Sequence, residues 1–179
     1  LKTGLAKIDA IKDYKELMAY VAETVASGDD NGIISTYVGA DEKNSTVNIL
    51  SLYQSGTSLP EKDYYTKQDS SSKAAREALV KYAAKLFTLT GTDAATADKN
   101  TAAVLALETE LEKYNRTPVE QRDSKKNYNK MSVADLDKQG SNINWPQIFA
   151  KMNVKIDSVN VGQPEYYAGL SKLLPTQPI

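Results

Sequence analysis

One carboxylate in this sequence falls on a predicted apolar helix face, where an unpaired charge would be costly. Glu108 lies within a helix predicted from Thr92 to about Tyr114. The residues four before, one before and three after it are apolar, namely Val104, Leu107 and Leu111. A carboxylate in such surroundings needs an ion-pair or hydrogen-bond partner. The planar guanidinium of an arginine can donate to both of its oxygens.

We predict that this partner is Arg122. The sequence has three arginines to choose from, Arg76, Arg116 and Arg122. The Glu108–Arg122 pair has two interpretations: an acid that faces a ligand, or a buried structural pair that attaches residues 116–130 to the helix. Structural ion pairs resemble functional sites in their electrostatics, and we favour the structural interpretation.

The residue types needed for most hydrolytic chemistry are missing. The sequence contains no histidine and no cysteine, whereas catalytic zinc sites nearly always use at least one histidine. A nucleophilic triad and a thiolate nucleophile are excluded for the same reason. No helical carboxylate pair at a spacing suited to acid–base catalysis is formed by Asp41, Glu42, Asp63 and Asp69. We therefore predict no catalytic residue and no metal ligand in this chain, and the sequence identifies no substrate-binding residue.

Length and charge exclude further classes of partner. The 179 residues suit a single domain, residues 1–179, which at this length buries roughly two thirds of its unfolded surface. The 22 basic and 23 acidic residues are spread along the chain with a net charge of −1, so nucleic acid is not an expected partner. No apolar run approaches the ~20 residues that span a bilayer. Leu1 is not a natural start residue, so we expect the chain to be part of a longer polypeptide.

Helical periodicity with recognisable N-terminal caps runs through most of the chain. A short helix is predicted around Leu5 to Ile11, and the other helices are predicted to start at capping signals. These signals are at Asp13, Asp69 or Ser70, Thr92, Thr117, Ser132, Asn144 and Gln163. The helix that ends near Gly91 carries two apolar stripes, so we expect a central helix packed by several neighbours.

The predicted β structure is small. Residues 33–40 and 47–52 are rich in β-branched and other apolar residues, and the polar residues 41–45 between them suit a turn. A hairpin is therefore predicted, and the alternation over residues 154–161 predicts one further short strand. The resulting fold class is mostly α: a multi-helix domain with a small β-hairpin.

Two tyrosine pairs, Tyr64-Tyr65 and Tyr166-Tyr167, form a second candidate binding feature. Their rings could line a peptide groove. The alternative, which we favour, packs one ring of each pair inward and leaves its neighbour facing water with the hydroxyl bonded.

Several short motifs occur in an order that resembles a known family. Between residues 38 and 65 the chain has ADEKNS, then Gln54, Leu59-Pro60 and Asp63-Tyr64-Tyr65. Further matching motifs are Leu107-Glu108-Thr109, Arg122-Asp123, Tyr128 to Met131, Trp145-Pro146, Val159-Asn160-Val161 and Pro164-Glu165-Tyr166. In this order and spacing the chain resembles the neprilysin and bacterial oligopeptidase O family of zinc metallopeptidases, in its N-terminal, non-catalytic region. The resemblance covers nearly the whole chain.

The resemblance implies a part of a mostly helical cap domain rather than a whole enzyme. In this family the cap closes a cavity over a thermolysin-like catalytic domain, where zinc is held by His-Glu-x-x-His and a downstream Glu-x-x-x-Asp segment. Neither motif is present here, and the substrate-carboxylate arginines of the family lie upstream of Leu1, so no site residue is carried over. The implied parent is a zinc metalloendopeptidase that hydrolyses oligopeptides, with zinc in the parent and none bound by this chain.

The implied role is to wall the substrate cavity and to limit by size which peptides enter it. The implied partner is the C-terminal catalytic domain of the same polypeptide, and this chain is expected to be inactive on its own. The alternative is a stand-alone helical binding or scaffold module without an enzymatic partner domain. One departure from the family is Ser55-Gly56-Thr57-Ser58, where relatives have a more apolar pattern. The cysteine-free sequence favours a bacterial source, in the periplasm, the cell envelope or outside the cell, with the cytoplasm as a further alternative.

Overall fold

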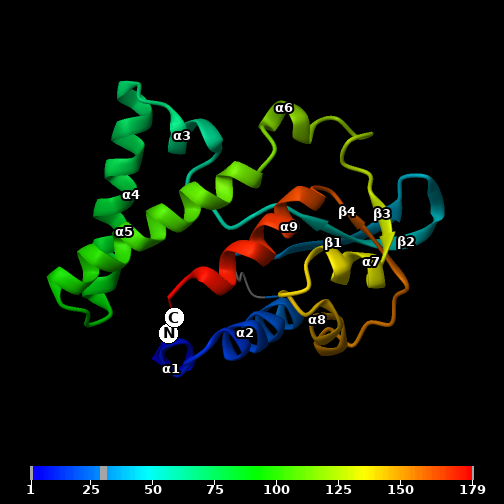
Figure 1. Cartoon of the computed structure of the whole chain (residues 1–179), viewed down its shortest axis with the longest axis horizontal. Coiled ribbons are helices and arrows are strands. Elements are labelled where there is room, and N and C mark those ends of the chain that lie inside the picture. Colours follow the sequence, from blue (N-terminus) through cyan, green and yellow to red (C-terminus); the bar gives the residue numbers. More distant parts are fainter. Residues whose placement is uncertain (1, 29–31, 179) are drawn as a thin grey trace. The chain divides into compact units, whose positions relative to one another are not determined.

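The computed structural model describes residues 2–28 and 32–178 (Figure 1). The chain forms two compact units. The first, which we call the sheet unit, comprises residues 1–55 and 122–179, and the second, the helix unit, comprises residues 56–121. The expectation of a single domain over residues 1–179 stays a prediction.

The helices and strands follow the sequence closely, and the mostly α fold class is confirmed. The sheet unit contains α1 (Lys2–Asp9), α2 (Tyr14–Ser27), β1 (Ser35–Asp41), β2 (Asn44–Tyr53), β3 (Lys130–Ser132), α7 (Val133–Gln139), α8 (Trp145–Lys151), β4 (Ser158–Val161), α9 (Pro164–Leu173) and the 3-10 helix η2 (Leu174–Thr176). The helix unit contains α3 (Lys62–Thr66), α4 (Ser70–Leu89), α5 (Ala94–Leu111), the 3-10 helix η1 (Glu112–Tyr114) and α6 (Pro118–Gln121).

The β structure is larger than the predicted hairpin. Strands β1 and β2 form that hairpin in antiparallel pairing, and the strand predicted within residues 154–161 is β4. The four strands lie in the order β1-β2-β4-β3, with β2 and β4 parallel and β3 and β4 antiparallel. Strand β3 was not predicted, because three residues are too few to show alternation.

The register of the sheet separates an apolar from a polar face. Leu52 pairs with Val161, and Ser51 pairs with Asn160 in the same parallel ladder. Because neighbouring side chains of a strand point to opposite faces, leucines and valines share one face while Ser51 and Asn160 share the other. The apolar face is fully buried at Leu52 and Val161, and it belongs to the core of the sheet unit. The buried helical side chains of this core are Met18, Val21, Ala22, Val25, Leu136, Trp145, Ile148, Phe149, Tyr166, Tyr167 and Leu170.

The helix starts were mostly predicted correctly. The side chains of Asp13, Asp69 and Ser132 accept hydrogen bonds from the backbone N–H three residues later, as capping residues do. The prediction for α5 was wrong by one residue, because Asp93 rather than Thr92 makes this contact, at 3.1 Å from the N–H of Thr96. A carboxylate is the stronger acceptor of the two side chains.

The prediction that α4 is a central helix is wrong. Of its residues, all of which are described, only Ser72 is buried. Tyr82, Leu86 and Leu89 are 64%, 45% and 69% exposed. Within the helix unit α4 packs against α5 and α3 (Figure 1). The stripe of Val80, Ala84 and Phe87 is half-buried, whereas Tyr82 and Leu86 of the other stripe are exposed. Periodicity shows which faces of a helix are apolar, and it does not show what covers them.

Candidate functional site

Glu108 is buried in the helix unit and holds the corner at Leu59 against α5. It is 8% exposed, and its carboxylate accepts hydrogen bonds from the Ser58 hydroxyl at 2.7 Å, the Ser58 backbone N–H at 3.1 Å and the Tyr65 hydroxyl at 2.6 Å. The Tyr65 oxygen in turn accepts from the Leu59 backbone N–H at 2.8 Å. Burial raises the pKa of Tyr65, and the hydrogen bond to Glu108 raises it further, so this hydroxyl remains a donor at neutral pH.

The partners of Glu108 differ in kind from the predicted arginine. Its burial is as predicted, whereas the donors just described are uncharged groups of Ser58 and Tyr65. Arg122 belongs to the sheet unit, so a Glu108–Arg122 pair would connect the two units, and it stays a prediction. Sequence reasoning missed Ser58 and Tyr65, although one signal was present: a buried carboxylate needs donors, and a buried tyrosine hydroxyl supplies one.

A second buried carboxylate, Asp41, ties the β1–β2 turn to β3 and to the segment before it. It is 1% exposed and accepts from Lys130 Nζ at 2.8 Å, the Tyr128 hydroxyl at 2.8 Å and the Lys43 backbone N–H at 2.9 Å. These bonds, that of Lys130 above all, lower the pKa of Asp41 to about 2. A carboxylate held ionised in this way is a structural acceptor and is poorly suited to proton transfer at neutral pH.

Asp41 therefore makes stability depend on pH in the acid range. Its pKa of about 2 in the folded chain lies below the usual value of about 3.9 in unfolded chains. The stabilisation is fully present above about pH 4 and is lost as the pH falls towards 2. We expect Asp41→Asn to be less stable at pH 6 and to lose less stability than the parent sequence between pH 4 and 2.

Urea denaturation between pH 2 and 6 measures this difference. The matched control is Asp98→Asn, at an exposed position on α5, which should follow the pH profile of the parent sequence. An Asp41→Asn profile parallel to that of the control would show that the Asp41 hydrogen bonds do not couple to folding.

The tyrosine pairs behave differently from each other. Tyr65 is buried and Tyr64 is half-buried, as expected for one inward ring. For the second pair the expectation is wrong, because Tyr166 and Tyr167 are 0% and 1% exposed. Their hydroxyls donate to the backbone carbonyls of Ile33 at 2.8 Å and Tyr53 at 2.7 Å. Both rings can be buried because both hydroxyls find backbone acceptors, one just before β1 and one at the end of β2.

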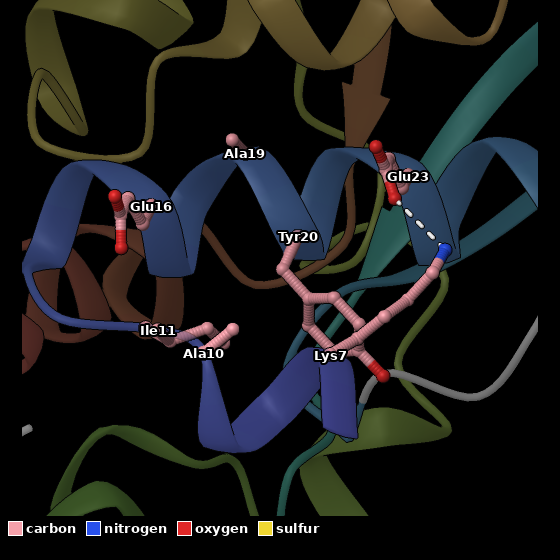
Figure 2. Close-up of a pocket in the computed structure, with 7 residues that line it drawn as sticks. All are labelled: Lys7, Ala10, Ile11, Glu16, Ala19, Tyr20 and Glu23. Atoms are coloured by element: carbon pink, nitrogen blue, oxygen red, sulfur yellow. Dashed lines mark hydrogen bonds and ion pairs between the residues drawn. The ribbon is translucent and has the colours of Figure 1, made fainter. Parts of the chain in front are cut away.

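A groove of about 420 Å³ runs between α1 and α2, and Figure 2 shows the residues that line it. They are Lys7, Ala10, Ile11, Glu16, Ala19, Tyr20 and Glu23. An exposed ion pair of 3.5 Å joins Lys7 and Glu23 across it, and such pairs contribute little energy. Because none of these seven described residues is buried, we assign the groove no site.

The residues of this chain do not fit a catalytic zinc site. Histidine and cysteine are absent from the sequence, and within residues 2–28 and 32–178 no three acidic side chains gather as metal ligands would. In the same part of the chain, no helix combines the length and the apolar character that crossing a membrane requires.

Comparison with known proteins identifies the family. The model of peptidase family M13 matches residues 1–179. The chain belongs to this family. Endothelin-converting enzyme 1 of Bos taurus is 30% identical over 147 residues, which are 78% of this chain and 19% of that enzyme. The family resemblance drawn from the motifs is thus confirmed.

Two solved structures share the fold of this M13 chain. The zinc metalloprotease Zmp1 of Mycobacterium tuberculosis, in complex with an inhibitor, has a TM-score of 0.87 and 29% identity. PepO from Lactobacillus rhamnosis has a TM-score of 0.80 and 26% identity. They match 97% and 96% of this chain, which spans 27% of each of them. The M13 chain therefore corresponds to about a quarter of these relatives and about a fifth of the curated enzymes.

Proposed function

We propose that this chain is part of the non-catalytic cap of a zinc metalloendopeptidase that hydrolyses oligopeptides. The main support is that nearly all of the chain superposes on a quarter of a zinc metalloprotease, while the chain itself has no histidine. Zinc and the groups that activate water would then lie in the remainder of the parent polypeptide, in a C-terminal catalytic domain.

The role of this part is to wall the substrate cavity and to limit entry to short peptides. A wall must keep its shape, and two buried carboxylates serve that need: Glu108 fixes the corner at Leu59, and Asp41 fixes the β1–β2 turn. A rigid wall excludes folded proteins by size and shields the reacting peptide from bulk water. A peptidase of this kind would act in the bacterial envelope or outside the cell.

A peptidase assay tests the proposal. With added zinc, the purified 179-residue chain is expected to show no cleavage of a fluorogenic oligopeptide above background. The full-length parent is expected to cleave it in a chelator-sensitive manner and to leave the same segment intact inside a folded domain. Chelator-sensitive turnover by the isolated chain would contradict the absence of catalytic groups, and cleavage inside the folded domain would contradict the size limit.

A further inference from the structure

The polar face of the sheet carries a small pocket, which shares one residue, Tyr128, with the Asp41 cluster described above. Its volume is about 100 Å³. It is lined by Tyr37, Gly39, Ala40, Glu42, Ile49, Ser51, Tyr53, Tyr128 and Asn160. All of these belong to the sheet unit, and they come from β1, the β1–β2 turn, β2, β4 and the segment before β3.

The pocket has aromatic walls and a polar floor. Three tyrosines, Tyr37, Tyr53 and Tyr128, supply the rings, and Ser51 and Asn160 beneath are 6% and 3% exposed. The Asn160 side chain is fixed, because its carbonyl oxygen accepts from the Asn129 backbone N–H at 2.7 Å. Hydrogen bonding within the chain therefore fixes this part of the floor.

Gly39 determines how the Tyr37 ring lies. A Cβ built on Gly39 would be 2.5 Å from Cε1 of Tyr37, so the ring lies directly over the glycine and follows the surface of the sheet. Tyr37 is nevertheless 63% exposed. A large aromatic ring that lies on the sheet with one open face is available to a ligand.

The side chains that line the pocket favour a cation. Of the described residues that line it, Glu42 carries a carboxylate and none is a lysine or an arginine. The nearby Lys130 is paired with Asp41 at 2.8 Å. The Tyr128 ring already attracts a cation, since Lys43 Nζ lies 4.3 Å from its centroid. Aromatic rings with a carboxylate at the rim stabilise ammonium and guanidinium groups.

We propose that this pocket binds the cationic end of a lysine or arginine side chain in a peptide, between the rings of Tyr37, Tyr53 and Tyr128 and beside Glu42. Its volume of about 100 Å³ exceeds the ≈ 30 Å³ share of one water molecule and is below the ≈ 300 Å³ at which pockets for whole small molecules begin. One side-chain end fits these limits. The preference for a cation follows from the pocket itself, and only the identification of the ligand as a peptide rests on the proposed function.

The test compares two small probes of similar shape that differ in charge. N-acetyl-lysine methylamide and N-acetyl-norleucine methylamide are titrated separately into the isotope-labelled 179-residue chain, and amide shifts are followed by NMR. The lysine probe is expected to shift the resonances of residues 37–42 and 128, and the norleucine probe is not. Tyr37→Leu should weaken binding of the lysine probe about threefold, as expected for the loss of one partly exposed cation–π contact.

Two further variants separate binding from loss of structure. Tyr82→Leu, which removes an exposed tyrosine on α4, should leave the affinity unchanged. Lys43→Met removes the internal competitor on the Tyr128 ring and should strengthen binding about threefold, a gain that a damaged fold would not give. Three results would overturn the proposal. They are equal binding of the two probes, no shift of the amide resonances of residues 37–42, and equal losses of affinity for the lysine probe in Tyr37→Leu and Tyr82→Leu. None of these results depends on peptidase activity, so they leave the cap role to its own assay.

Discussion

Replacing Glu108 with alanine is expected to destabilise the helix unit by about 2–3 kcal/mol. The buried hydrogen bond from Tyr65 to the carboxylate contributes about 1.5–3 kcal/mol, and the two from the exposed Ser58 add less. Glu108 accepts three hydrogen bonds from Ser58 and Tyr65. The substitution leaves the buried Tyr65 hydroxyl without its acceptor, whereas the donors of the exposed Ser58 can turn to water. It also detaches the corner at Leu59 from α5.

Urea denaturation followed by circular dichroism measures the loss, and hydrogen exchange at residues 58–66 locates it. The matched control is Glu110→Ala on the same helix. Glu110 is exposed and forms a surface ion pair with Lys113 at 2.5 Å, so its removal should cost no more than about 0.5 kcal/mol. Glu108→Gln keeps the shape of the side chain and one acceptor oxygen. Its loss of stability should therefore lie between those of Glu108→Ala and Glu110→Ala. If Glu108→Ala is no less stable than the control, the carboxylate does not hold this corner.

The sequence was sufficient for features that depend on near neighbours. The caps at Asp13, Asp69 and Ser132 were predicted because donor and acceptor are three residues apart, and each contact is present. The hairpin was predicted because strand, turn and strand are continuous in the chain. In these cases the residue types and their spacing are enough to predict the local structure, because the interacting groups are close together in the chain.

The partners of Glu108 and the order of the strands are set by contacts far apart in the chain. The donors from Ser58 and Tyr65 come from 50 and 43 residues earlier. Strand β4 pairs in parallel with β2, which brings Asn160 beside Ser51, and the floor of the aromatic pocket exists only because of that pairing. Neither contact has a local signal in the sequence, so the need of Glu108 for a partner was predicted correctly and Ser58 and Tyr65 were not.

Replacing Trp145 with alanine is expected to cost the sheet unit about 3–5 kcal/mol, the usual range for truncating a buried large aromatic residue. Trp145 is 0% exposed. Its ring centroid is 5.9 Å from that of Phe149, and it meets Tyr167 edge-on at 5.1 Å. The cavity would therefore open where α8 and α9 share the core. Because Trp145 is the one tryptophan of the sequence, urea denaturation must be followed by circular dichroism rather than by its fluorescence.

Trp145→Phe separates the contribution of packing from that of the indole N–H. This nitrogen is buried and has no hydrogen-bond partner among residues 2–28 and 32–178, so phenylalanine gives up contact area and no bond. We expect a cost of about 1–2 kcal/mol. Tyr82→Ala, which removes a ring that is 64% exposed, should change stability by no more than about 0.5 kcal/mol. A cost for Trp145→Phe close to that of Trp145→Ala would mean that the N–H has a partner, such as a buried water molecule, and that hydrogen bonding rather than packing dominates at this position.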